Sequence, residues 1–145
     1  MIVSANKVNR MFAIANKMYK LADENPRLFN AEEMFTLGSV HDIGYKFTDN
    51  ILLHNTVGGE VLKNQHYKYW KEVYYHGFYQ IEYKSAALIL LNYADLTTDE
   101  NGNDTDFQHR YIEICNEFGT DSNIAINTKK LMEELPNDLI ELGLI

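Results

Sequence analysis

The sequence predicts an all-α fold, in which residues 1–145 form a single domain of about seven or eight helices. Apolar residues recur at spacings of three and four along most of the chain, as on helices that bury one face. The segments between them carry residues that begin or end helices. A chain of 145 residues, 46% hydrophobic and 23% charged, is long enough to bury about 68–70% of its unfolded surface in one globular domain.

The first helix is expected from Ala5 to Ala22 and ends near Asn25-Pro26. Its apolar face is formed by Val8, Met11, Phe12, Ala15, Met18, Tyr19 and Ala22. A second helix is expected from Ala31 to Gly44. Asn30, with Glu33 three residues later, is typical of a helix N-terminus, and Gly44 is expected to end the helix.

Three further helices are expected in the middle of the chain, over residues 55–63, 67–76 and 85–96. The first contains Gly58-Gly59, which costs about 1 kcal/mol per glycine and indicates either close helix packing or room for a substrate. The last is apolar almost all round, which indicates a buried helix. The aromatic residues around the second either pack in the core or form a wall that stacks on a nucleobase. They are Tyr67, Tyr69, Trp70, Tyr74, Tyr75, Phe78, Tyr79 and Tyr83.

The last part of the chain is expected to begin with a tight turn at Asn101-Gly102, which favours a short hairpin after Asp95. Thr105 with Gln108 has the spacing of a capping box, and predicts a helix that ends at Phe118. A further helix is expected from Asn123 to Leu135. A short one follows Pro136, because proline suits a first helical turn.

The strongest chemical signal is the pair His41-Asp42, which stands between the apolar residues Val40 and Ile43. A carboxylate in apolar surroundings is costly unless a positive charge meets it. A divalent metal ion supplies that charge and also accepts an imidazole nitrogen. The alternatives are a helix cap or a surface pair.

A second signal is Asp95, which lies inside the apolar helix expected at residues 85–96. No Arg or Lys stands within one helical turn of it in the sequence. A buried aspartate therefore requires a metal, a hydrogen-bonded histidine or a cation from elsewhere in the chain.

Taken in order, these residues resemble the HD-domain superfamily of metal-dependent phosphohydrolases. The resemblance runs from Leu37 to Asp95 and covers somewhat under half the chain. It includes the His41-Asp42 dyad, Leu52-Leu53-His54-Asn55-Thr56-Val57-Gly58, Tyr75-His76-Gly77 and Asp95. Within the superfamily the chain looks most like the small bacterial branch that cleaves dinucleoside polyphosphates symmetrically.

The resemblance implies a metal centre with one or two divalent ions, iron or manganese, that hydrolyses a nucleotide or another phosphate ester or anhydride. Its ligands would be His41, Asp42, His54, His76 and Asp95. Asp42 would bridge two ions and act in catalysis, with His41 and Asp95 on one ion and His54 and His76 on the other. Lys46 and Arg110 are expected to neutralise phosphate charge, the alternative for each being an exposed surface residue.

Two departures from the family pattern bear on activity. Family members usually carry a histidine on the first helix, whereas residues 6–10 contain no His, Asp or Glu. One metal is therefore expected to have an open or water-filled position. The lysine that often follows the dyad is displaced, since Tyr45 stands there and Lys46 comes next. The alternative function is accordingly a catalytically weak HD-like module that binds a nucleotide or a partner protein.

The net charge and the apolar content of the chain limit the classes of partner that it can bind. A formal charge of −8 argues against duplex nucleic acid, because such binding depends on Lys and Arg at phosphates. The single cysteine, Cys115, excludes an internal disulfide and is expected in the core. The N-terminus has no signal pattern, and no apolar run reaches the length that spans a bilayer. We therefore expect a cytoplasmic protein that binds a small-molecule phosphate and not a membrane, with a homodimer left open.

Overall fold

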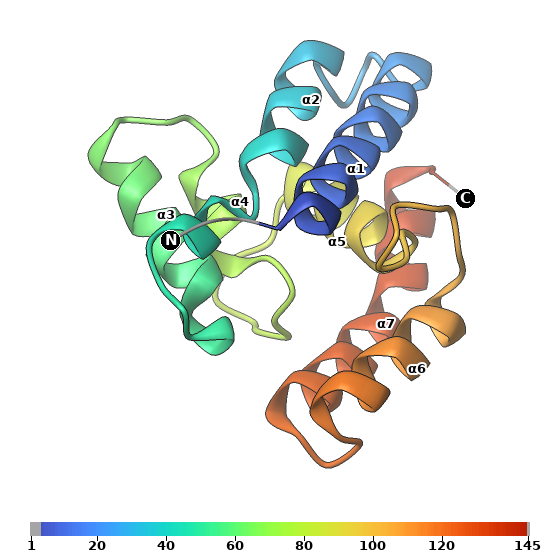
Figure 1. Cartoon of the computed structure of the whole chain (residues 1–145). Helices are drawn as coiled ribbons and strands as arrows, with labels where there is room; N and C mark the ends of the chain where they lie inside the picture. The colour runs from blue at the N-terminus through green and yellow to red at the C-terminus, as the bar shows by residue number, and fades with distance from the viewer. Residues whose placement is uncertain (1–3, 145) are drawn as a thin grey trace.

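The computed structural model describes residues 4–144, and within that range it contains only helices and the loops that join them (Figure 1). The prediction of an all-α fold is confirmed. The α-helices are α1 (Ala5–Glu24), α2 (Ala31–Val40), α3 (His54–Asn64), α4 (Trp70–Tyr75), α5 (Ala86–Leu96), α6 (Phe107–Phe118) and α7 (Asn123–Leu142). Two short 3₁₀ helices, η1 (Ile43–Lys46) and η2 (Ile51–Leu53), lie between α2 and α3.

Side-chain caps explain where several helices begin. The Asn30 side chain accepts a hydrogen bond from the Glu33 amide at 2.9 Å, as the sequence predicts. Ser85 caps α5 and Ser122 caps α7 in the same way, at 3.0 and 3.1 Å. Each such cap satisfies an amide that the helix leaves unpaired and contributes about 1 kcal/mol.

The predicted capping box at Thr105 is wrong, because Asp106 caps α6 by accepting from the His109 amide at 2.8 Å. The Thr105 amide instead donates to the Thr97 carbonyl at 2.9 Å. That bond and a single bridge between Thr98 and Asp104 close the expected turn at residues 101–102 into a hairpin-like loop. Thr105 therefore belongs to this loop and the helix begins after it.

Pro136 lies inside α7, so the predicted break between two C-terminal helices is wrong. Leu131, Leu135 and Leu139 are buried and stand four residues apart on one face of this helix. An interior proline costs about 3 kcal/mol. Continuous burial of this apolar stripe requires one helix, which overrides the local signal at Pro136.

Two other helices are shorter than the sequence predicts. The second helix ends at Val40, so His41 stands at its C-terminus, and the chain then passes through η1. The helix expected from Tyr67 begins only at Trp70, because the Tyr67 amide turns back to the Leu62 carbonyl at 3.0 Å. The first change places the His41-Asp42 pair just after a helix C-terminus.

Helix α5 lies at the centre of the molecule, between α1 and the pair α6 and α7 (Figure 1), and contributes to two hydrophobic clusters. One face of α5 packs with α1 to α4 through Leu90 and Leu91, both fully buried. Ile89 and Leu96 pack instead against α6 and α7, which run side by side. This central position explains why α5 is apolar almost all round.

The glycines near the dyad allow very close packing. A Cβ at Gly44 would lie 1.6 Å from the His54 carbonyl oxygen, and one at Gly58 would lie 2.9 Å from the Gly44 nitrogen. A Cβ at Gly59 would meet Tyr74 at 2.5 Å. Of the two explanations for the Gly58-Gly59 pair, close packing is therefore the one that applies. It holds α3, which begins at His54, against η1 and against α4, which His76 follows.

No helix in residues 4–144 combines the length and the apolar character that a membrane crossing requires.

Candidate metal centre

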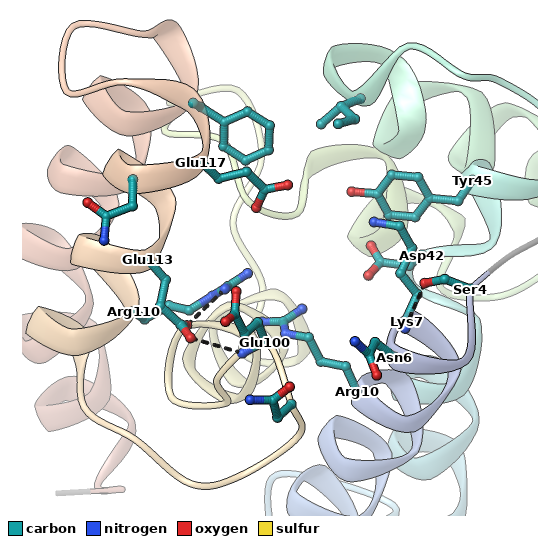
Figure 2. Close-up of a pocket in the computed structure, with 14 residues that line it drawn as sticks. Ser4, Asn6, Lys7, Arg10, Asp42, Tyr45, Glu100, Arg110, Glu113 and Glu117 are labelled. Atoms are coloured by element: carbon teal, nitrogen blue, oxygen red, sulfur yellow. Dashed lines mark hydrogen bonds and ion pairs between the residues drawn. The ribbon is translucent and has the colours of Figure 1, made fainter.

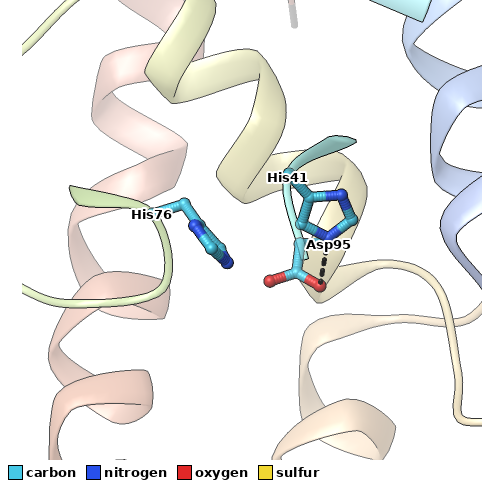
Figure 3. A group of neighbouring side chains, drawn as sticks. All are labelled: His41, His76 and Asp95. Carbon is cyan, nitrogen blue, oxygen red and sulfur yellow. Dashed lines mark ion pairs between the residues drawn. The ribbon is translucent and has the colours of Figure 1, made fainter. Parts of the chain in front are cut away.

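The five predicted ligands meet at one place although they come from four parts of the chain. His41 and Asp42 follow α2, His54 begins α3, His76 follows α4, and Asp95 lies in the last turn of α5. Figure 3 shows His41 and His76 on opposite sides of the Asp95 carboxylate. This arrangement brings together the side chains that the sequence predicts as ligands of one metal centre.

Asp42 stands at the middle of the cluster. Its Oδ1 atom lies 3.2 Å from both His54 Nε2 and His76 Nε2, and its Oδ2 atom lies 3.2 Å from His41 Nε2. Only 12% of the Asp42 side chain is exposed. One buried carboxylate thus faces three imidazole nitrogens.

The opposite nitrogen of each histidine points to a backbone carbonyl three residues earlier. Nδ1 lies 2.6 Å from the Gly38 oxygen in His41, 2.7 Å from the Ile51 oxygen in His54 and 2.5 Å from the Val73 oxygen in His76. A carbonyl oxygen only accepts, so each Nδ1 carries the proton and donates it. Each Nε2 is then left with a lone pair that points at the cluster, as in metal-bound histidines.

The lone pairs of these Nε2 atoms face one another, and too few donor hydrogen atoms lie between them to form hydrogen bonds. His54 Nε2 and His76 Nε2 are 3.3 Å apart, and no hydrogen lies between them when both rings are neutral. His41 Nε2 is fully buried and makes no hydrogen bond of acceptable geometry with any described residue. A cation bound here accepts lone pairs that no hydrogen bond satisfies, so the donor set fits a divalent metal. Two groups of atoms are close enough to hold one, Asp42/His54/His76 and His41/His76/Asp95.

The electrostatics of the site affect its ligands differently. Burial lowers the pKa values of His41 and His54, but the neighbouring Asp42 carboxylate raises both above the usual value. Burial opposes the charge of Asp42, yet His41, His54 and His76 hold its pKa well below the usual range. Burial lowers the pKa of His76, which favours its neutral form. A charged carboxylate and a neutral imidazole are the states that coordinate metal ions.

The first-helix position that lacks a histidine is occupied by Arg10. Its Nη2 atom lies 2.8 Å from Asp95 Oδ1 and donates to the Asp95 and Thr98 carbonyls at 2.6 and 3.0 Å. Arg10 is therefore the cation from elsewhere in the chain that Asp95 requires. Arg10 therefore stands where the sequence predicts an open or water-filled position on one metal ion, and that position stays a prediction.

Neighbouring residues fix the positions of the histidines. Asn55 Nδ2 donates to the Tyr74 carbonyl at 2.9 Å, and Asn92 Oδ1 accepts from the Gly77 amide at 2.9 Å. Together they hold the chain on both sides of His76. The Tyr45 ring stacks on His54, with centroids 4.3 Å apart and planes 5° apart.

A cavity of about 580 Å³ opens beside Asp42, between α1 and α6. Figure 2 shows Lys7, Arg10 and Tyr45 on one side, and Arg110, Glu113 and Glu117 on the other. A smaller cavity, of about 100 Å³, continues to His54, His76 and Asp95. The cluster is thus reached from a polar cavity large enough for a small ligand.

The two predicted phosphate-binding residues differ in position. Arg110 lines both cavities and donates from Nη1 to Glu113 at 3.1 Å. Lys46 is exposed and lines neither of them, so its role stays a prediction. Lys7, whose Nζ lies 4.2 Å from the Tyr45 ring centroid, stands in the larger cavity instead.

The aromatic stretch serves mainly in packing. Tyr67, Tyr69 and Trp70 pack against the cluster shared by α1 to α5. Of this stretch, Phe78 lines the cavity that reaches the histidines. No other aromatic residue of that stretch lines either of the two cavities beside the cluster.

Arg10 and Lys7 are the site residues that sequence reasoning did not assign a role. A signal was present, because Asp95 needed a cation and the arginines of the chain are Arg10, Arg27 and Arg110. Nothing local ties Arg10 to Asp95, a residue 85 positions away.

The comparisons with known proteins add no assignment, since no family model, no curated protein and no solved structure matches the chain. The functional argument therefore depends on the geometry of this site.

Proposed function

We propose that the chain is a metal-dependent phosphohydrolase of the HD type, which acts on a nucleotide or another phosphate ester or anhydride. The observation that supports this most is the convergence of three histidine Nε2 atoms on Asp42, each ring being fixed by an Nδ1 bond to a backbone carbonyl. Structural histidines satisfy both nitrogens, whereas these leave their lone pairs directed at one point.

Asp42/His54/His76 is one of two groups close enough to hold an ion, and Arg10 pairs with the carboxylate of the other. Two imidazoles and one carboxylate with positions left open are typical of iron(II) sites, and manganese accepts the same donors. When bound, a divalent ion supplies Lewis-acid activation of a phosphoryl oxygen and of a nucleophilic water. Asp42 contributes by holding that charge in place at the edge of the larger cavity.

The residues of the cavity would bind and orient the substrate. Lys7 and Arg110 are the cationic side chains of the cavity besides Arg10, which pairs with Asp95, and they would bind phosphate oxygens. Glu100, Glu113 and Glu117 line the same cavity. This is why we propose a small phosphate compound as the substrate of a chain whose formal charge is −8. Cytoplasmic residence and a homodimer stay predictions.

The first test is the metal content of the purified protein, followed by chelation and reloading with Mn²⁺ or Fe²⁺. We expect the reloaded protein to release phosphate from a nucleotide panel that includes AMP, ATP and a dinucleoside tetraphosphate. At a free metal concentration of 100 times the dissociation constant, the metal should stabilise the fold by about 2.7 kcal/mol. The melting temperature would rise by about 5–10 °C. Absence of both metal binding and stabilisation would refute the proposal.

A second candidate function, the catalytically weak binding module, is favoured by one observation. Arg10 already compensates the charge of Asp95, so part of the cluster is stable without metal. Such a module would be stabilised by a nucleotide and would release no phosphate at any metal load. Turnover that requires Mn²⁺ or Fe²⁺ favours the enzyme instead.

A further inference from the structure

The ion pair between Arg10 and Asp95 bears on how many metal ions the centre holds. We propose that the Arg10 guanidinium takes the place of a second metal ion, so that the centre binds one divalent ion with Asp42, His54 and His76. This inference depends on the proposed function, because it concerns the same metal centre. It replaces the two-ion arrangement that the family resemblance implies.

The Arg10 guanidinium already pairs with the Asp95 carboxylate. Only 11% of the Arg10 side chain and 16% of the Asp95 side chain are exposed, and Nη2 lies 2.8 Å from Oδ1. Three further bonds hold the guanidinium, because Nη2 also donates to the carbonyls of Asp95 and Thr98, and Nε donates to the Asp99 carbonyl at 3.2 Å. A guanidinium bound at four points is not easily displaced.

His76 belongs to both groups of ligand atoms. Its Nδ1 donates to the Val73 carbonyl, so only Nε2 has a lone pair to offer. One lone pair binds one ion. If the ion bound by Asp42 and His54 also takes the His76 lone pair, a second ion has only His41 and Asp95 as ligands that it does not share.

The charges of the site also oppose a second ion. Asp42 and Asp95 carry two negative charges, and Arg10 with one divalent ion already supplies three positive ones. His41 Nε2 lies 4.0 Å from Asp95 Oδ1, and an ion held between them would stand next to the guanidinium on that same oxygen. Like charges in a buried site with so few ligands oppose each other strongly. The second ion is therefore excluded while Arg10 is present.

The test counts Mn²⁺ ions in the chelated and reloaded full-length chain, by elemental analysis and by electron paramagnetic resonance. We expect one Mn²⁺ per wild-type chain, with the spectrum of an isolated ion. Arg10→His removes the guanidinium and supplies the missing imidazole, so this variant should bind two Mn²⁺ and give the spectrum of a coupled pair. Lys7→His is the matched control, because Lys7 stands on the same helix and lines the same cavity but does not contact Asp95. It should bind one.

Each other outcome decides against the inference. Two coupled Mn²⁺ ions in the wild type would overturn it and leave the proposed function intact. No Mn²⁺ in the wild type would overturn both. One ion in Arg10→His, or two in Lys7→His, would mean that Arg10 is not what excludes the second ion. If Arg10→His does not fold, the wild-type count and spectrum still decide.

Discussion

Asp42→Asn is expected to lower the affinity for metal by at least about 100-fold, the upper range for loss of a single supporting partner of a ligand. Asp42 is the carboxylate that lies 3.2 Å from each of three imidazole nitrogens. Asparagine keeps the shape of the side chain but removes the negative charge that balances the ion. The measurement is Mn²⁺ titration of the chelated protein, with phosphate release measured in parallel.

The matched control for this substitution is Asp49→Asn. Asp49 is an exposed aspartate in the loop that follows η1, and it makes no ion pair with any residue in 4–144. It should bind Mn²⁺ as the wild type does. Full metal occupancy in Asp42→Asn, in a protein whose circular dichroism is unchanged, would show that Asp42 is not a ligand.

Gly44→Ala is expected to destabilise the fold by about 3 kcal/mol, the upper end of what overpacking costs. The new Cβ would lie 1.6 Å from the His54 carbonyl oxygen and 3.0 Å from the Gly58 nitrogen. Both are backbone atoms, so no side chain can rotate away, and α3 must shift relative to η1. The melting temperature should fall by about 6–12 °C, and His54 should move away from Asp42.

The control for this prediction is Glu60→Ala, because Glu60 lies on the exposed side of α3. A surface substitution of this kind changes stability by about 0.5 kcal/mol at most, or about 2 °C. A Gly44→Ala variant that melts as close to the wild type as this would contradict the close packing described at Gly44. Metal titration of the same variant separates a loss of the site from a loss of the fold.

Local signals predicted most of the helices because capping and apolar periodicity act within one or two turns. Asn30 caps α2 with its own side chain, and the apolar run before Asp95 is buried as expected. The same local reasoning failed at Thr105 and at Pro136. In both cases a contact outside the local window decided the outcome, a bond to Thr97 for the first and burial of Leu139 for the second.

The His41-Asp42 pair and Asp95 could be chosen from the sequence because their chemistry is unusual in apolar surroundings, whereas His54 and His76 were chosen as ligands from the family resemblance. A carboxylate or an imidazole is costly to bury without a partner, so His41, Asp42 and Asp95 are informative wherever they fall. What the chain order cannot give is which partner each one finds. Asp95 was expected to need a cation, and either a metal or an arginine meets that need.

The sequence by itself determined that this chain is helical, and it predicted His41, Asp42, His54, His76 and Asp95 as candidate ligands. Only the tertiary structure decided that Arg10 pairs with Asp95 and that Gly44 touches His54. The physical reason is that helix formation depends on neighbours within a few residues. The packing of α1 on α5 instead joins residues 85 positions apart, and no local pattern encodes that contact.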